Sequence, residues 1–204
     1  MQKLNGKPLL LLGFTLFSMF FGAGNLIFPP FLGAQAGTNL WLAFAGFAVS
    51  AIGLPIAGVI SVARADGLPE LAGRVHPAFA RIFAILLYLS IGPLLGITDP
   101  KEIAQGTIRA GGVAAGLLTL SLPLLHALYP AAIALIFLSF LPRNAQKPSV
   151  YRCCILPTAL QSIAAAFPLG VLSAAANALP LASLGFGWVV PAGIGICVGL
   201  VIDR

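Results

Sequence analysis

The chain has 204 residues, of which only 8% are charged and 59% are hydrophobic. A soluble domain carries about a quarter charged residues, so this composition excludes an ordinary soluble globular protein. The net charge of +6 does not indicate a nucleic-acid partner, because the basic residues form no stripe and no aromatic residues are interleaved with them.

The charged residues are confined to short clusters between long apolar segments. The charge-free segments are residues 8–63, 82–98, 110–142 and 153–202. A helix needs roughly 20 apolar residues to cross the hydrocarbon core of a bilayer, and backbone polar groups in lipid must be hydrogen-bonded within their own segment. The apolar–polar alternation of a membrane β-barrel is missing. The sequence therefore predicts an all-α integral membrane protein surrounded by lipid.

The first charge-free segment predicts two membrane spans. They cover residues 8–32 and 40–63 and are joined by an uncharged turn, residues 33–39. A cleaved secretory signal is the alternative for the first span, because two lysines precede it. We favour a membrane span, since another long apolar run follows in place of a polar mature domain.

A polar loop and a shorter span follow these two. The loop, residues 64–81, predicts a solvated cytoplasmic face, and the third span, residues 82–97, is interrupted by Gly92-Pro93. Residues 98–109 are polar again. The last charge-free segment predicts two spans, residues 155–174 and 181–202, with a hinge between them at residues 177–180.

Residues 110–141 are too short for two spans and longer than one span requires. The positive-inside rule favours one crossing. With a cytoplasmic N-terminus and a single crossing, every basic residue except Lys101 and Arg109 lies on the cytoplasmic side. The prediction is about six transmembrane helices, with both termini cytoplasmic.

The first span contains the least regular segment of the chain, Gly22-Ala23-Gly24-Asn25-Leu26-Ile27-Phe28-Pro29-Pro30. Relative to alanine, glycine costs a helix interior about 1 kcal/mol and proline about 3 kcal/mol. The segment therefore predicts an unwound helix near the middle of the membrane. Unwound backbone is tolerated there only where protein buries it or water reaches it. A proline kink where the helix leaves the membrane is the alternative, and the residues alone support both equally.

Transporters use broken helices as binding sites. Freed carbonyl groups coordinate a cation, and the N–H groups at the start of a half-helix bind a substrate carboxylate. Gly22, Ala23, Gly24 and Asn25 are therefore candidate substrate ligands. Gly22 and Asn25 are also candidate cation ligands.

Several segments resemble the family of branched-chain amino acid:cation symporters. They are residues 14–30, Gly53-Leu54-Pro55 with Gly58, Arg74-Val75-His76-Pro77, residues 81–93 and residues 185–203. The resemblance is nearly continuous over residues 4–97. It implies a bacterial cytoplasmic-membrane carrier of about twelve spans, built from inverted repeats around a broken first helix. It also implies that leucine, isoleucine or valine enters together with sodium or protons.

The chain departs from this family in its length. It resembles an early, a middle and a late part of a family member joined together, so we expect an internally shortened version. The three parts are residues 1–97, 98–121 and 122–204, with junctions near residues 96–98 and 120–123. We expect no second broken helix facing the first, which would leave the substrate site incomplete.

A few other residues are candidates for a function. Tyr88 lies in the third span, where the resembling fold places side chains against the substrate, although simple packing also explains a tyrosine there. His126 is either a proton relay or an accidental histidine beside a junction. Gln161 and Ser162 are expected to join helices through polar contacts.

No constellation of residues suggests an enzyme or a metal site. The three cysteines, Cys153, Cys154 and Cys197, have no zinc-binding spacing. The leading hypothesis is cation-coupled uptake of branched-chain amino acids, with Gly22 to Asn25 and Tyr88 as substrate ligands. A non-transporting remnant or accessory subunit is the main alternative, and a small channel is a more distant one. The coupling ion and the oligomeric state stay open, and no cofactor other than that ion is expected.

Overall fold

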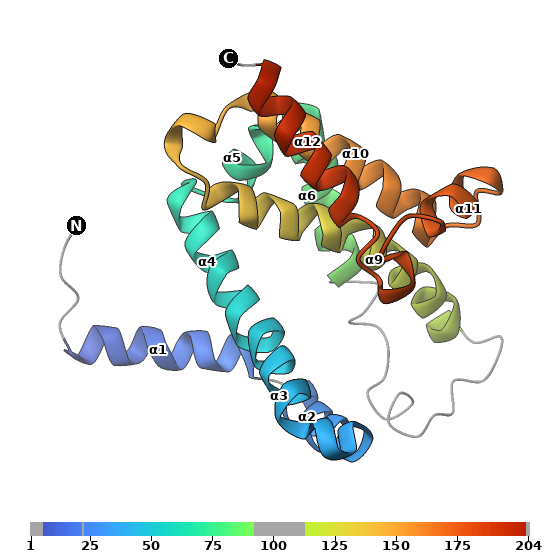
Figure 1. The fold of residues 1–204 in the computed structure, drawn as a ribbon. Helices are drawn as coiled ribbons and strands as arrows, with labels where there is room; N and C mark the ends of the chain where they lie inside the picture. The colour runs from blue at the N-terminus through green and yellow to red at the C-terminus, as the bar shows by residue number, and fades with distance from the viewer. Residues whose placement is uncertain (1–5, 22, 92–112, 203–204) are drawn as a thin grey trace. The chain divides into compact units, whose positions relative to one another are not determined.

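The computed structural model describes residues 6–21, 23–91 and 113–202, and every regular element within these ranges is a helix (Figure 1). The α-helices are α1 (Gly6–Phe20), α2 (Ala23–Ala36), α3 (Leu40–Ala48), α4 (Leu54–Arg64), α5 (Leu68–Gly73), α6 (Pro77–Ile91), α9 (Val113–Ser139), α10 (Pro148–Ala166), α11 (Val171–Asn177) and α12 (Val189–Ile202). The Gly92-Pro93 interruption, the polar loop 98–109 and the junction predicted near residues 96–98 lie outside the described residues. The chain divides into two compact units, residues 1–59 and 60–204, and each unit is described by itself.

In the first unit, the predicted first span consists of two helices. Helix α1 ends at Phe20 and α2 begins at Ala23. The prediction that the prolines unwind the helix is wrong, because α2 continues through Pro29 and Pro30. Each proline removes one backbone hydrogen bond and crowds a carbonyl one turn earlier. The remaining helical bonds still hold α2 together, and the interruption falls at the glycine end of the motif.

The turn between the first two predicted spans is shorter than expected. A single turn of 3-10 helix, Gly37–Asn39, separates α2 from α3. Gly37 has a φ of +51°, which an L-residue other than glycine adopts only with strain. The chain therefore changes direction at Gly37.

A second irregularity, which the sequence analysis missed, lies between α3 and α4. Residues Val49–Gly53 form a single π-helical turn. Pro55 lies two residues after Gly53, and its ring crowds the carbonyl group of Ala51 within the π turn. The wider π turn moves that carbonyl aside, which explains why the π turn lies just before the proline.

The first unit has no buried residue among those whose side chains are described. Its large apolar side chains are open, with Trp41 80% and Leu42 77% exposed. In water such a surface would be unstable, and in lipid it is favourable. The exposed apolar helices thus agree with a membrane environment.

Among the described residues, fewer helices are long and apolar enough to cross a bilayer than the number of predicted spans. Within the described residues, one stretch, Phe28–Arg64 with 37 residues, is long and apolar enough to cross a bilayer as a helix. The pair α10 and α11, bent by 110°, qualifies as a second candidate if it is one broken span. Four apolar helices are shorter: Gly6–Ser18, Pro77–Ile91, Pro123–Ser139 and Val189–Ile202. The count of about six spans stays a prediction.

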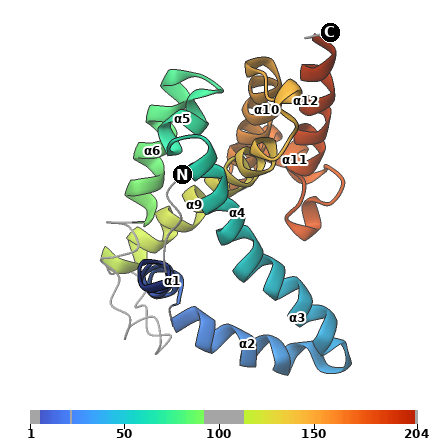
Figure 2. The same ribbon diagram turned by 90° about the vertical axis from the view of Figure 1, so that its left-hand side faces the viewer.

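The second unit is built around α9. Helix α10 packs against α9 and α12, while α5 and α6 cover another side of α9 (Figure 2). Helix α9 runs unbroken through Pro123 and Pro130. The described part of residues 110–141 therefore contains one helix and not two. One helix agrees with the single crossing that the positive-inside rule favours. Ser139 at the end of α9 donates a 2.7 Å hydrogen bond to the buried Ser61 hydroxyl of α4.

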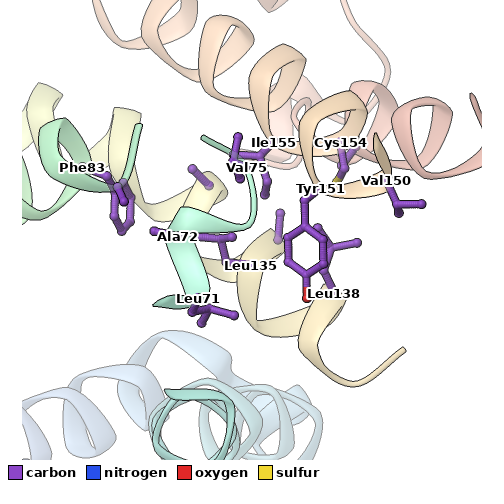
Figure 3. Close-up of a cluster of buried hydrophobic side chains, with 14 of the residues drawn as sticks. Leu71, Ala72, Val75, Phe83, Leu135, Leu138, Val150, Tyr151, Cys154 and Ile155 are labelled. Carbon is purple, nitrogen blue, oxygen red and sulfur yellow. The ribbon is translucent and has the colours of Figure 1, made fainter. Parts of the chain in front are cut away.

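The polar loop predicted over residues 64–81 forms part of the core. Leu71, Ala72 and Val75 are at most 1% exposed, and they pack with Leu135 and Tyr151 (Figure 3). The prediction of a purely solvated face is wrong. Its buried residues Leu71, Ala72 and Val75 pack in the core with residues of α6, α9 and α10, while Arg64, Asp66, Glu70 and Arg81 lie at the surface.

The motif Arg74-Val75-His76-Pro77 explains how this segment is held. Arg74 Nη1 donates hydrogen bonds to Tyr151 Oη at 2.9 Å and to Gln146 Oε1 at 3.0 Å. Arg152 Nε donates to the Val75 carbonyl at 2.8 Å. His76 Nδ1 accepts a 3.1 Å hydrogen bond from the Ala78 amide, which satisfies one free donor in the first turn of α6. Each polar residue of the motif therefore connects this segment to α10 or starts α6.

The boundaries of the last two predicted spans are wrong. Helix α10 begins at Pro148, since Val150 and Tyr151 are fully buried and Pro148 suits a first helical turn. The final helix begins at Val189 and not at residue 181. Leu181 and Gly185 have φ angles of +67° and +77°, which no right-handed helix contains.

Close packing of α12 on α10 depends on glycine. A Cβ atom at Gly195 would overlap the backbone of Cys153, and one at Gly199 would overlap Val150. Glycines four residues apart let two membrane helices approach to backbone contact. By contrast, a Cβ atom at Gly193 meets nothing within 4 Å.

We predict that Gly195→Ala lowers the melting temperature of the purified protein in detergent. Overpacking costs about 1–3 kcal/mol, which corresponds to a decrease of roughly 2–12 °C for a chain of this size. Gly193→Ala is the matched control and should leave the melting temperature unchanged or raise it slightly. Equal melting temperatures for the two variants would contradict the close approach of α10 and α12.

We also predict that Tyr151→Phe destabilises the second unit by about 1–2 kcal/mol, because the Arg74 guanidinium loses a buried acceptor. Tyr129→Phe is the control, since Tyr129 is 54% exposed. Thermal unfolding followed by circular dichroism measures both. An unchanged Tyr151→Phe variant would show that the Arg74 contact does not hold residues 64–81 in place.

Candidate functional site

The interruption between α1 and α2 is the site that the sequence predicted. The last turn of α1 directs its carbonyl groups toward this interruption, and the first turn of α2 directs the N–H groups of Ala23, Gly24 and Asn25 toward it. Gly22 itself and the side chain of Asn25 lie outside the described residues. The backbone thus has the polarity of a broken-helix site, with partial negative charge on one side and partial positive charge on the other.

Aromatic and hydroxyl groups surround the end of α1. The rings of Phe17 and Phe21 stack with their centroids 4.7 Å apart. Thr15 Oγ1 donates to the Leu11 carbonyl at 2.9 Å, and Ser18 Oγ donates to the Thr15 carbonyl at 2.8 Å. These hydroxyl protons are used within α1, so in this arrangement the two oxygens can offer only their acceptor lone pairs to a ligand.

The remaining predicted ligand, Tyr88, lies in the second unit. Its side chain is 72% exposed on α6, and it lines none of the three cavities described below. The predicted ligand set is thus divided between the two units, and the structure does not bring Tyr88 into a pocket of its own unit.

A second interrupted helix, which we did not expect, lies in the second unit. Helix α10 ends at Ala166, and α11 begins at Val171 after a bend of 110°. Pro168 cannot continue the hydrogen bonds of α10, and Gly170 has a φ of +62°. The sequence contained this signal in Pro168 and Gly170, but the hinge was expected further along the chain, near residues 177–180.

A polar cavity of about 210 Å³ lies beside this bend. It is lined by His126, Pro130, Gln161, Ser162, Ala165, Ala166, Asn177, Ala182, Gly185, Gly187 and Trp188. His126 and Gln161 come from α9 and α10, and Asn177 ends α11. The structure therefore brings together polar residues that the sequence analysis treated separately.

The hydrogen bonds around this cavity correct one expectation. Gln161 Nε2 reaches the Ala176 carbonyl of α11 at 3.5 Å, so Gln161 joins two helices as expected. Ser162 Oγ donates to the Thr158 carbonyl of its own helix at 2.7 Å and does not join two helices. Serine makes this bond readily because the carbonyl one turn earlier is the nearest acceptor.

Two further cavities lie in the second unit. One, of about 390 Å³, is apolar and lies between α6, α9 and α10, with Phe79, Leu128 and Leu160 among its lining residues. The other, of about 580 Å³, is polar and contains Arg64, Arg74 and Arg143. Neither includes a residue that the sequence analysis selected as a ligand.

The chemistry of the described residues suits binding and passage of a small molecule. They contain no cluster of three metal-ligating side chains. Two interrupted helices in an apolar helical chain are typical of secondary transporters, where helix ends and unwound backbone face a polar guest. This arrangement is typical of one class, the helical membrane transport proteins.

The chain belongs to the branched-chain amino acid transport protein family, whose model matches residues 5–104 and 103–204. It is 49% identical over 92 residues to the branched-chain amino acid permease BraB of Bacillus subtilis. This aligned stretch covers 45% of this chain and 21% of the relative. It is 46% identical over 105 residues to the permease BrnQ of Bacillus subtilis, 50% of this chain and 24% of the relative. The BrnQ permease of Lactobacillus delbrueckii subsp. lactis is 40% identical over 119 residues, 55% of this chain and 27% of the relative.

The matched stretches thus span about a quarter or less of the length of these curated relatives. No solved structure matches the chain significantly. The relatives are permeases and carriers and not enzymes, in agreement with the sequence analysis. The family also identifies the chain as a membrane protein.

We predict that a cysteine at position 23 reacts with a hydrophilic methanethiosulfonate reagent, because the interruption between α1 and α2 faces water or a polar ligand. The background variant carries Cys153→Ser, Cys154→Ala and Cys197→Ala. Leu11→Cys, at a position 67% exposed in the middle of α1, is the control and should stay unmodified, since a thiol in lipid does not form the reactive thiolate. Equal protection of both cysteines would show that the interruption lies in lipid or in closely packed protein.

Proposed function

We propose that the chain acts in cation-coupled uptake of the branched-chain amino acids leucine, isoleucine and valine across the bacterial cytoplasmic membrane. The observation that carries the proposal is the interruption between α1 and α2, which falls within the segment that resembles the symporters. The family supports amino acid transport, and the names of the relatives support branched-chain substrates.

The two helix ends suit the two charges of an amino acid and its coupling ion. N–H groups in the first turn of α2, with those of Ala23, Gly24 and Asn25 foremost, would hold the substrate carboxylate. Carbonyl groups at the end of α1 and around Gly22 would hold sodium, or would lie beside the group that carries a proton. The side-chain amide of Asn25 could donate a hydrogen bond to the substrate carboxylate through its NH₂ group, and its oxygen could coordinate the cation.

The substrate side chain requires an apolar surface next to these polar groups. Phe17 and Phe21 stack beside the interruption and offer such a surface. Tyr88 stays a proposed substrate ligand. Cytoplasmic termini are part of the same proposal, since they place most basic residues on the cytoplasmic side.

A second candidate is a membrane protein of this family that does not transport by itself. The family match supports it, because it consists of two segments that meet near residue 103. The stretches aligned with the relatives cover only about a quarter of their length. A chain joined in this way would lack helices that close the substrate site, and it would act only beside a longer carrier.

Uptake of radiolabelled leucine into liposomes that contain only this chain separates the two candidates. We expect leucine to accumulate inside the liposomes when an inward sodium or proton gradient is applied. Asn25→Ala should reduce uptake about tenfold or more, because a hydrogen bond to a charged group contributes about 1.5–3 kcal/mol.

Asn39→Ala is the matched control, because Asn39 is an exposed asparagine in the turn after α2. It should transport like the unmodified chain. An equal decrease of leucine uptake in Asn25→Ala and Asn39→Ala would contradict the role proposed for Asn25. No accumulation by the unmodified chain under either gradient would overturn independent transport and favour the second candidate.

A further inference from the structure

The polar cavity of about 580 Å³ in the second unit is the most basic place in the described residues. Its polar lining consists of Arg64, Arg74, Arg143, Ser61, Ser139 and Gln146. No carboxylate lines it, and no described carboxylate forms an ion pair with its arginines. Glu70, the acidic residue of α5, turns back onto Gly67. Three guanidinium groups thus share one cavity without a counter-ion from the described residues.

Helix ends neutralise only part of this charge. Helix α4 ends at Arg64 and α9 ends at Ser139, and each C-terminus carries roughly half a negative charge. Against three arginines this leaves a net charge of roughly +2. Capping of helix ends therefore does not account for all three arginines.

Two of the arginines are held in position before any ligand arrives. The Arg74 guanidinium donates to Tyr151 and Gln146 through Nη1, which leaves its other N–H groups for a ligand. The Arg64 guanidinium lies 5.0 Å from the centre of the Phe140 ring. Arginines that are already ordered lose less conformational entropy on binding.

Gln146 ties the end of α9 to the cavity wall. Its Nε2 donates to the carbonyl groups of Ser139 at 2.9 Å and Leu141 at 2.6 Å. The Nε and Nη2 groups of Arg74 donate to no described residue, so they can donate to an external anion. Planar guanidinium groups bind phosphate through paired hydrogen bonds.

The position of the cavity distinguishes a lipid from a soluble anion. Arg64 and Ser139 lie where two apolar helices end, and the ends of helices that cross a bilayer lie near its headgroups. Phe137 and Phe140, in and just after the last turn of α9, are 58% and 44% exposed and provide an apolar surface for an acyl chain. Basic pockets between membrane helices bind anionic headgroups in this way.

We propose that this cavity binds the phosphate of an anionic phospholipid, with Arg64, Arg74 and Arg143 as the ligands. The site is separate from the interruption between α1 and α2. It requires only that the chain lies in a membrane and does not depend on transport.

The test is native mass spectrometry of the purified full chain mixed with phosphatidylglycerol or phosphatidylcholine of identical acyl chains. We expect phosphatidylglycerol to be retained preferentially. Arg143→Gln should reduce its retention about fivefold, the effect of one basic residue at a membrane surface. Arg143 is exposed, so its replacement should leave the melting temperature unchanged, which shows that the variant folds.

Arg81→Gln is the matched control, because Arg81 is an exposed arginine of α6 that does not line the cavity. It should retain phosphatidylglycerol like the unmodified chain. Equal retention of the two lipids, or equal loss in both variants, would overturn the proposal. Complete displacement of the lipid by glycerol phosphate would identify the site as one for soluble phosphates, and that would overturn the proposal as well.

Discussion

A peptide N–H or C=O group without a hydrogen bond costs several kcal/mol in hydrocarbon, and this cost governs where the helices of this chain stop. Within the described parts of its apolar segments the backbone is helical almost throughout, even across Pro29, Pro30, Pro123 and Pro130. It is interrupted between α1 and α2, between α10 and α11, and between α11 and α12. Such interruptions are stable only where another polar partner is near. They therefore direct attention to places that a ligand, water or another helix fills.

In the second unit, the polar segment 64–81 is packed against the apolar helices and is not a loose loop. Residues 64–81 place Leu71 and Val75 into a core shared with α9 and α10, while Arg74 binds Tyr151 and Gln146. The buried Ser139–Ser61 hydrogen bond joins α9 to α4 nearby. Burial of apolar residues contributes most of the free energy that stabilises this packing. The hydrogen bonds determine which residues lie opposite each other. Arg74 both holds this core and lines the most basic cavity, so the fold and the proposed lipid recognition share this residue.

Family membership and chain length lead to different expectations about activity. The family match covers nearly the whole chain, in two segments that meet near residue 103. The permeases that it resembles are several times longer than the aligned stretches. A transport site needs helices on more than one side of the substrate, because a half-open site leaves the bound charge exposed to lipid or bulk water. In the proposed function, the interruption between α1 and α2 would supply one side of such a site.

The sequence by itself determined the helical class, the membrane environment and the interruption near Gly22. These follow from local properties, namely the length of apolar runs and the inability of particular residues to continue a helix. Tertiary structure alone decided that residues 64–81 belong to the core and that His126, Gln161 and Asn177 share a cavity. These features depend on contacts between distant residues, such as Arg74 and Tyr151, which lie 77 residues apart. Hydropathy reports only the average environment of a segment, whereas burial of one side chain depends on what packs against it.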